Sequence, residues 1–248
     1  MRVAALYDIH GNLPALEAAL EDVYTSGADL ILVGGDAVLG PMPRETLEYL
    51  LDARLPVQFI RGNCEREMLV QIAGGEPASV PPAFRSLMRW VGDQLSPEQL
   101  RILESWPPAL QVEIPGLGDV LFCHATPRSD TECFTRDTAE ERLWPVFDGL
   151  DVAAVICGHT HMQFDRVVGR IRVINAGSVG MPFGEPGAYW LLLGPGVQHR
   201  RSTYDLARGA QRIRATEYPQ AQEFAANNVM QPPSEERMLE IFSKAELR

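Results

Sequence analysis

Short apolar runs alternate with amphipathic stretches along the first half of this chain, and this alternation most constrains its fold. The runs cover residues 3–7, 30–33 and 57–60. Helical stretches lie between them, one capped by Asn12 and one at about residues 45–51. Parallel strands connected by crossover helices produce this pattern, so we expect an α/β fold.

The second half predicts a different arrangement. Residues 74–107 are expected to be a mainly helical excursion, with a capping box formed by Ser96 and Gln99. Strands are then predicted at 111–114, 120–123, 152–157, 163–168, 170–174, 189–193 and around His199. Their close spacing is typical of a β-meander, so the sheets should be mixed rather than purely parallel.

A helical tail is expected from about residue 206 to the end of the chain. The last helix carries an apolar stripe made of Met238, Ile241, Phe242 and Ala245. We expect this stripe to pack within the molecule rather than against a second copy of the chain. Oligomerisation is left open by the sequence.

Size and composition exclude several classes of protein. A length of 248 residues suits one domain, so residues 1–248 are interpreted as a single domain. Neither a signal-peptide h-region nor a membrane-spanning run is found, and the four cysteines form no CxxC pair. We therefore expect a cytoplasmic protein without disulfides or a membrane anchor. A net charge of -11 opposes general nucleic-acid binding.

Polar residues follow five of the apolar runs directly. They are Asp8, His10, Asp36, Asn63, His124, His159 and His161. In open α/β sheets, ligands bind outside the carboxyl ends of the strands, so these side chains can converge there. Taken singly, each histidine could be a hydrogen-bonded loop residue, Asp36 a turn or cap residue, and Asn63 a turn residue or an N-cap.

Taken together, these residues predict a metal site. Two carboxylates, one amide and four imidazoles supply seven ligand groups. This mixture of nitrogen and oxygen suits Mn, Fe, Co, Ni or Zn better than Ca or Mg alone. Seven groups are too many for one ion, but they suit two divalent ions that share a carboxylate.

The motifs resemble those of the calcineurin-like metallophosphoesterase superfamily. They are DIHGN at 8–12, GGD at 34–36, GNCE at 62–65, His124 after a strand, GHTH at 158–161 and NAGSVG at 175–180. The resemblance is closest to the small bacterial and archaeal phosphodiesterase-type branch, which carries GNC where larger phosphatases carry GNH. It implies a four-layer α/β/β/α sandwich with two mixed β-sheets.

The resemblance also implies a ligand set and an activity. One metal would be held by Asp8, His10 and His161, the other by Asn63, His124 and His159, with Asp36 and a water or hydroxide bridging them. Asn63 and His124 would also take part in catalysis. The implied enzyme is a dinuclear metal-dependent phosphoesterase that acts on a small phosphate ester, preferably a phosphodiester, through the bridging hydroxide.

The sequence departs from the phosphatase pattern at two places. The GGDAVLG segment lacks the Asp-Arg-Gly of protein Ser/Thr phosphatases, and Cys64 replaces a histidine that can assist the leaving group. An unperturbed thiol, with a pKa of about 8.5, suits that task poorly near neutral pH. We interpret Cys64 as a small packed residue, with a catalytic thiol as the alternative.

Other interpretations remain open at this point. Arg128, Arg136 and the 74–107 excursion could shape the substrate pocket, or they could be solvated surface and core packing. The enzyme could instead hydrolyse a dinucleoside polyphosphate or a phosphoprotein. A non-catalytic interaction scaffold on the same fold is the alternative from another class, although a scaffold would have little reason to keep all seven ligand positions.

Overall fold

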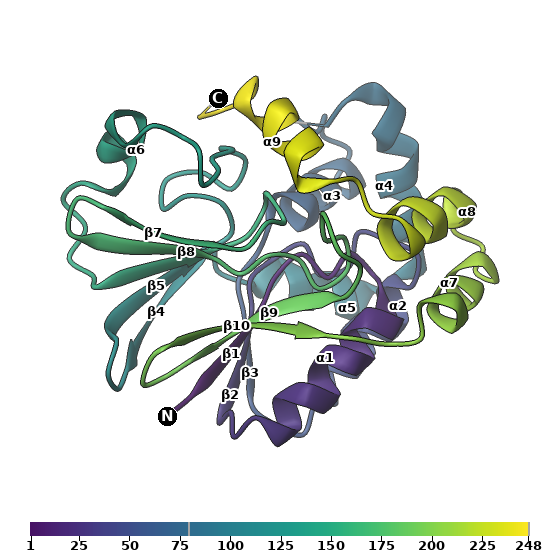
Figure 1. Ribbon diagram of the computed structural model, residues 1–248. Coiled ribbons are helices and arrows are strands. Elements are labelled where there is room, and N and C mark those ends of the chain that lie inside the picture. The colour runs from purple at the N-terminus through teal and green to yellow at the C-terminus, as the bar shows by residue number, and fades with distance from the viewer. Residues whose placement is uncertain (79, 248) are drawn as a thin grey trace.

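The computed structural model describes residues 1–78 and 80–247, in which the strands form two five-stranded sheets (Figure 1). The first sheet has the order β10-β9-β1-β2-β3. Its strands are β1 (Val3–Leu6), β2 (Leu30–Val33), β3 (Val57–Phe59), β9 (Ala188–Leu193) and β10 (Val197–Ser202). The β1, β2 and β3 strands are parallel, whereas β9 is antiparallel to both of its neighbours.

The second sheet has the order β4-β5-β6-β8-β7. Its strands are β4 (Ala109–Ile114), β5 (Gly118–Cys123), β6 (Ala154–Cys157), β7 (Phe164–Val168) and β8 (Ile171–Asn175). The β5, β6 and β8 strands run parallel, and an antiparallel strand closes each edge. The prediction of mixed sheets is therefore confirmed, and the strands predicted at 111–114 and 120–123 pair as the antiparallel β4 and β5.

Helices cover the outer face of each sheet. Their bounds are α1 (Leu13–Thr25), α2 (Pro43–Leu51), α3 (Asn63–Ile72), α4 (Pro82–Gln94), α5 (Pro97–Ser105), α6 (Glu140–Phe147), α7 (Leu206–Arg214), α8 (Ala221–Phe224), the π-helix η1 (Ala225–Met230) and α9 (Glu235–Ser243). Apolar residues of α1 to α5, α7, α8 and η1 share one core with the first sheet, and α6 packs on the second. The predicted four-layer α/β/β/α sandwich is confirmed.

The side chains of β1 point alternately to the two faces of the first sheet, which shows how the sequence builds these layers. Val3 and Ala5 face the second sheet, whereas Ala4 and Leu6 face the helices. All four are completely buried. Since burying a valine or leucine side chain contributes about 1.5–3 kcal/mol, a strand that is apolar on both faces is stable only between two layers.

The helix caps also follow the sequence. The Asn12 side chain accepts a hydrogen bond from the Ala15 amide at 3.3 Å, at the start of α1. At the start of α5, the Ser96 side chain accepts a hydrogen bond from the Gln99 amide at 3.2 Å, and the Gln99 side chain accepts one from the Ser96 amide at 2.8 Å. Both predicted caps are present, and each satisfies backbone amides that the first helical turn leaves without a partner.

The structure adds two helices that the sequence analysis did not predict. The α3 helix begins at Asn63 within the GNCE motif; a ligand, a turn residue and an N-cap were the interpretations of Asn63, but the helix itself was not predicted. The α6 helix contains Pro145, which is a helix-breaking signal in sequence. Packing of Leu143 and Phe147 against the second sheet stabilises α6 despite this proline.

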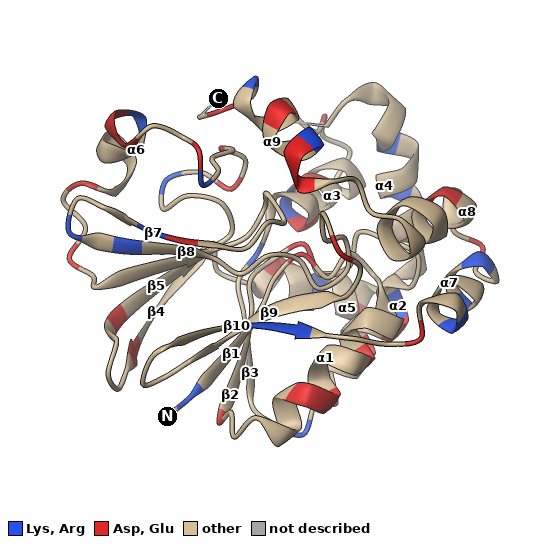
Figure 2. Cartoon of the chain, viewed as in Figure 1, with Lys and Arg blue, Asp and Glu red and all other residues tan. Residues whose placement is uncertain are grey.

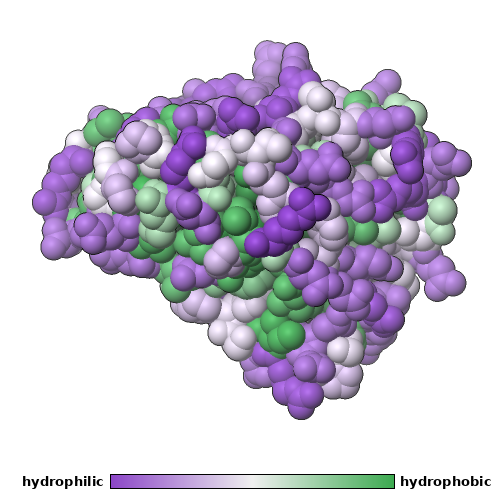
Figure 3. Space-filling view, turned by 90° about the horizontal axis from the view of Figure 1, so that it is seen from below, coloured by the Kyte–Doolittle hydropathy of each residue, from purple (hydrophilic) through white to green (hydrophobic). Residues whose placement is uncertain are grey.

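The distribution of polarity agrees with the layers. Charged residues lie mainly on helices and loops, while most strand segments carry other residues (Figure 2). Seen from below, hydrophobic residues form a band across the middle of the face, bordered by hydrophilic residues (Figure 3). In the described part of the chain, no helix is both long and apolar enough to cross a membrane.

Close packing of two loops holds the segment after β1. The Gly180 amide donates to the Asp8 carbonyl at 3.0 Å, and the Asn12 side chain donates to the Gly180 carbonyl at 2.8 Å. A Cβ atom at position 180 would lie 1.8 Å from the carbonyl oxygen of Ile9. Only glycine therefore fits between these loops.

We predict that Gly180→Ala destabilises the protein by about 1–3 kcal/mol, because the added methyl group must push two backbone segments apart. Gly196→Ala is the matched control, since its Cβ would meet nothing within 4 Å. Urea unfolding measures both changes. Equal midpoints for the two variants would contradict the close packing described here.

Candidate metal centre

The seven predicted ligand residues converge at the carboxyl ends of the strands. Asp8 and His10 follow β1, Asp36 follows β2, and Asn63 begins α3 just after β3. His124 follows β5, and His159 and His161 follow β6. Parallel strands bring these ends to a common edge, although the residues are far apart in sequence.

Three overlapping groups of side chains could each hold a metal ion, with ligand atoms within 4.8 Å of one another. They are Asp8 with His10 and His161, His10 with Asp36 and Cys64, and Asp36 with His124 and His159. Asp36 belongs to two of the groups. The Oδ1 atom of Asn63 joins the last group, at 3.0 Å from His124 Nε2.

The donor atoms face one another closely. The Nε2 atoms of His10 and His161 are 3.3 Å apart, and Asp8 Oδ1 lies 3.4 Å from His161 Nε2. Asp36 Oδ2 lies 3.4 Å from His124 Nε2 and 3.9 Å from His10 Nε2. Asp36 therefore faces both halves of the cluster, and Asp8 Oδ1, which lies 3.9 Å from His124 Nε2, does so as well.

Backbone carbonyls orient three of the histidines. The Nδ1 atoms of His10, His124 and His161 lie 3.2, 2.9 and 2.7 Å from the carbonyl oxygens of Leu39, Gly34 and Met181, respectively. A carbonyl oxygen can only accept, so each Nδ1 carries a proton and donates. Each Nε2 is then left as the lone-pair ligand for a metal.

Asp8 provides a separate test of whether the residues fit a cation. Its side chain is completely buried, and its Oδ2 accepts a hydrogen bond from the His159 amide at 2.8 Å. Its Oδ1 has no hydrogen-bond partner among the described residues. A buried carboxylate oxygen without a partner is costly, and a divalent cation would satisfy it. The donor set and this oxygen both fit divalent metals.

The backbone of the site is strained. Five ligand residues have a positive φ, namely Asp8 (53°), His10 (49°), Asp36 (51°), His159 (65°) and His161 (59°). Each such residue costs about 1–3 kcal/mol and persists only where its surroundings hold it. The loops after β1 and β2 hold each other, because the amides of Asp8 and His10 donate to the carbonyls of Gly35 and Asp36.

Charge coupling shifts the pKa values of the cluster. Burial raises the pKa of Asp36. Attraction to His124 and His10, together with hydrogen bonds to His124 and Cys64, outweighs burial and holds that pKa well below its ordinary value. Burial also disfavours charge on His124, yet Asp36 and Asp8 raise its pKa to about 10. Burial and repulsion from His124 lower the pKa of His159 to about 4. A histidine must lose its proton to bind a metal, so protonation of His124 and metal binding compete.

Glu65 is a buried residue of the site whose role the sequence analysis did not predict, although it lies within the GNCE motif. Its carboxylate accepts hydrogen bonds from the amides of Asp36, Ala37 and Val38 at 2.9, 2.7 and 3.3 Å. It also accepts from the Gly62 amide at 3.0 Å. Glu65 thus ties the loop that carries Asp36 to the loop that carries Asn63. The sequence signal that could have indicated this role is the position of Glu65 shortly after Gly62, at the end of a strand.

Cys64 contacts the shared carboxylate directly. Its thiol donates to Asp36 Oδ2 and its amide donates to Asp36 Oδ1, both at 2.9 Å. Burial, followed by repulsion from Asp36 and Glu65, raises the pKa of the thiol well above its ordinary value. Cys64 is therefore a protonated hydrogen-bond donor to Asp36.

Cys133 is another neighbour of the centre that the sequence analysis did not select. Its sulfur lies 3.5 Å from His159 Nε2, and burial raises the pKa of its thiol to about 11. Nothing in the local sequence marks it, because the long loop after β5 brings it to His159.

The two arginines considered for the pocket are both paired with carboxylates. Arg128 donates to Glu132 at 2.7 Å, and Arg136 donates to Glu235 at the start of α9 at 2.7 Å. Each guanidinium group therefore already has a carboxylate partner within the fold.

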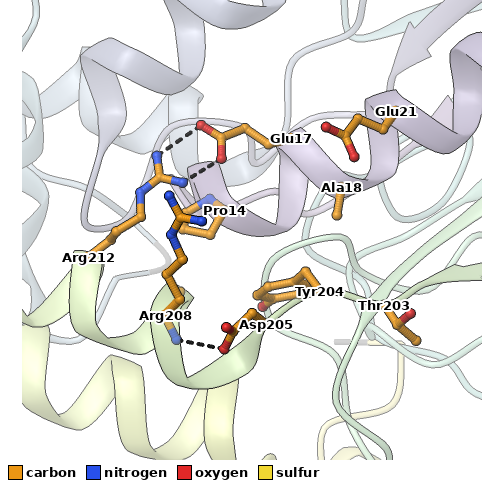
Figure 4. Close-up of a pocket in the computed structure, with 10 residues that line it drawn as sticks. Pro14, Glu17, Ala18, Glu21, Thr203, Tyr204, Asp205, Arg208 and Arg212 are labelled. Atoms are coloured by element: carbon orange, nitrogen blue, oxygen red, sulfur yellow. Dashed lines mark hydrogen bonds and ion pairs between the residues drawn. The ribbon is translucent and has the colours of Figure 1, made fainter.

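A hollow of about 350 Å³ lies elsewhere, between α1 and α7 (Figure 4). Glu17 and Arg212 face each other across it and make two hydrogen bonds at 2.5 and 2.9 Å. Asp205 accepts from the Arg208 amide at 2.9 Å. Because these carboxylates already have partners within the fold, we place the candidate site at the strand ends instead.

The chain is similar to known proteins over most of its length. The sequence profile of the calcineurin-like phosphoesterase superfamily domain matches residues 1–193, which include all seven ligand positions. An uncharacterized protein of Methanocaldococcus jannaschii is 29% identical over 199 residues, which make up 73% of this chain and 76% of that protein.

Two solved structures share the fold over nearly the whole chain. A hypothetical protein from Pyrococcus horikoshii OT3 superposes with a TM-score of 0.78 at 21% identity, covering 94% of this chain and 99% of that one. A metallophosphoesterase from Sphaerobacter thermophilus superposes with a TM-score of 0.69 at 26% identity, covering 91% and 99%.

We predict that Asp36→Asn lowers the bound metal more than Asp8→Asn does, because Asp36 belongs to two of the three ligand groups and Asp8 to one. The measurement is metal content per chain by elemental analysis after loading with Mn²⁺. Equal metal content in the two variants would remove Asp36 from the shared position.

Proposed function

The chain belongs to the calcineurin-like phosphoesterase superfamily, and from this membership we propose that it is a dinuclear metal-dependent phosphoesterase that prefers phosphodiesters. One observation carries the proposal. The ligand groups fall into two halves, and Asp36 is shared by groups on both sides. Such sharing suits a pair of ions better than a single ion.

The two proposed metal positions share the segment after β6 and otherwise take their ligands from the ends of different strands. Asp8, His10 and His161 would hold one ion, and Asn63, His124 and His159 would hold the other. Mn, Fe, Co, Ni and Zn all suit this mixture of imidazole, amide and carboxylate ligands. Divalent ions bound here would supply Lewis acidity that activates a water molecule and neutralises charge on the phosphate.

The chain's own residues prepare the site for these ions. Carbonyl contacts keep the Nε2 atoms of His10, His124 and His161 directed inward. Glu65 holds the loops of Asp36 and Asn63 together. Because these contacts exist before a substrate arrives, little reorganisation is needed on binding.

The preference for diesters rests on Cys64. A general acid typically contributes about 10²- to 10⁴-fold to the rate, mainly where the leaving group needs a proton. The Cys64 thiol has a raised pKa and directs its proton to Asp36. We therefore assign it a packing and positioning role, so substrates with good leaving groups should be cleaved best.

We also propose that the protein acts in the reducing cytoplasm on a small phosphate ester. All four cysteines are free thiols in the structure, which suits a reducing compartment. The acidic net charge of -11 disfavours nucleic acid as a general partner.

We predict metal-dependent hydrolysis of a generic aryl phosphodiester. Activity should disappear with a chelator and return with Mn²⁺ or a similar ion, because every proposed catalytic contact is made through the ligand cluster. Turnover is measured by release of the aryl group. Full activity in protein shown to be metal-free would disprove the proposed chemistry, and fully loaded but inactive protein would favour a non-catalytic role.

A separate prediction concerns Cys64. Cys64→Ala should keep bound metal and most diester activity, since the position 64 amide still donates to Asp36. Cys64→His should raise the monoester-to-diester ratio of kcat/KM if its imidazole reaches the leaving oxygen. Both variants are compared at equal metal content. Loss of most diester activity in loaded Cys64→Ala would show that the thiol itself takes part.

A further inference from the structure

We propose that residues 235–247, here called the C-terminal strap, cover the metal centre and limit the size of the phosphate ester that reaches it. The strap consists of α9 and the four residues that follow it. In Figure 1 the yellow α9 crosses above the loops at the strand ends. This inference rests on the proposed phosphoesterase function, because it concerns access to the same site.

One contact of the strap leads to the first proposed metal position. Phe242 of α9 lies 6.1 Å from Phe183, measured between ring centroids. Phe183 in turn stacks on the imidazole of His161 at 5.3 Å, with an interplanar angle of 19°. The strap therefore reaches the edge of this half of the centre through two aromatic rings.

The other end of the strap leads to the second proposed metal position. The Leu247 amide donates to the Cys133 carbonyl at 2.8 Å, and the Cys133 sulfur lies 3.5 Å from His159 Nε2. Because His161 and His159 are assigned to different ions, the strap spans both halves of the centre.

Polar contacts at its two ends hold the strap in place. At its start, Glu235 accepts from Arg136 at 2.7 Å. At its end, Glu246 accepts from Thr138 at 2.7 Å and pairs with Arg142. These partners belong to the loop after β5 and to α6, so the strap is tied to the second sheet's side of the molecule.

The strap is attached weakly enough to open. The α9 helix buries none of its side chains completely, and Ile241 on its apolar stripe is 45% exposed. The expectation that this stripe packs within the molecule is met in part, because Phe242 contacts Phe183 and Met238 is half-buried, whereas Ile241 and Ala245 are exposed. Exposed ion pairs typically contribute less than about 1 kcal/mol each, and segments with few buried contacts open locally at low cost.

A closed strap has a direct consequence for substrate choice. A small ester can approach the metals beside the strap, whereas an ester on a large carrier needs the strap to move away. Weakening the anchors should therefore change the cleavage of large esters more than that of small ones.

The test compares one aryl phosphodiester in two forms, free and attached to soluble dextran. The anchoring variant is Glu235→Ala with Glu246→Ala. Glu240→Ala is the matched control, because Glu240 also lies in the strap but pairs locally with Lys244 at 3.1 Å. A second variant, Phe242→Ala, removes the aromatic contact to Phe183.

We expect the anchoring variant to raise the ratio of kcat/KM for the dextran-linked ester to that for the free ester about tenfold. This change corresponds to about 1.4 kcal/mol in the free energy of closing the strap. Phe242→Ala should raise the ratio in the same direction, and Glu240→Ala should leave it unchanged. A ratio that is the same in all four proteins at equal metal content would overturn the proposal.

A measurement without turnover separates this proposal from the proposed function. Release of bound Mn²⁺ to a chelator should be faster in the anchoring variant than in the wild type or Glu240→Ala. If the wild type binds Mn²⁺ but cleaves neither ester, the proposed function fails. The release rates then still test whether the strap covers the metal centre. Equal release rates in all variants would show that the strap does not cover the metal centre.

Discussion

Two buried carboxylates, Asp8 and Asp36, lie in one cluster, and the rest of the structure accommodates their negative charge. Each raises the cost of ionising the other, and burial adds to that cost. Imidazoles of His124 and His161 offset the repulsion in the protein itself. Divalent cations would offset it more completely, since Asp8 Oδ1 makes no hydrogen bond within the described part of the chain. The candidate ligand cluster therefore also has an electrostatic role in the fold, because its imidazoles offset the charge of the two carboxylates.

Holding this cluster together requires local strain. Five ligand residues have a left-handed backbone, which ordinary side chains rarely adopt. The strain persists because loops after different strands hydrogen-bond to one another. In addition, the Glu65 carboxylate accepts hydrogen bonds from four backbone amides in two loops. A rigid double sheet, with apolar residues packed between its layers, gives these loops fixed starting points.

Functional residues are distributed unevenly between the two sides of the centre. The first sheet supplies both carboxylates, whereas the second supplies His124, His159 and His161. Both proposed ligand sets take residues from both sheets, so separation of the sheets would divide each set. The core between the sheets therefore supports the candidate site as well as stability. The C-terminal strap adds a third contribution from helical chain that extends beyond the family match at residue 193.

The sequence by itself determined the strands, the two helix caps and the candidate ligand residues, because each depends on neighbours along the chain. An apolar run that ends in Asp8 or His124 already carries its ligand to a strand end. Only the tertiary structure decided the roles of Glu65, Cys133 and Phe183, since their contacts join segments far apart in sequence. It also decided that α6 forms despite Pro145, because burial against the second sheet outweighs the local preference. Periodicity records which way a side chain points, whereas the partner it meets depends on the packing of the whole chain.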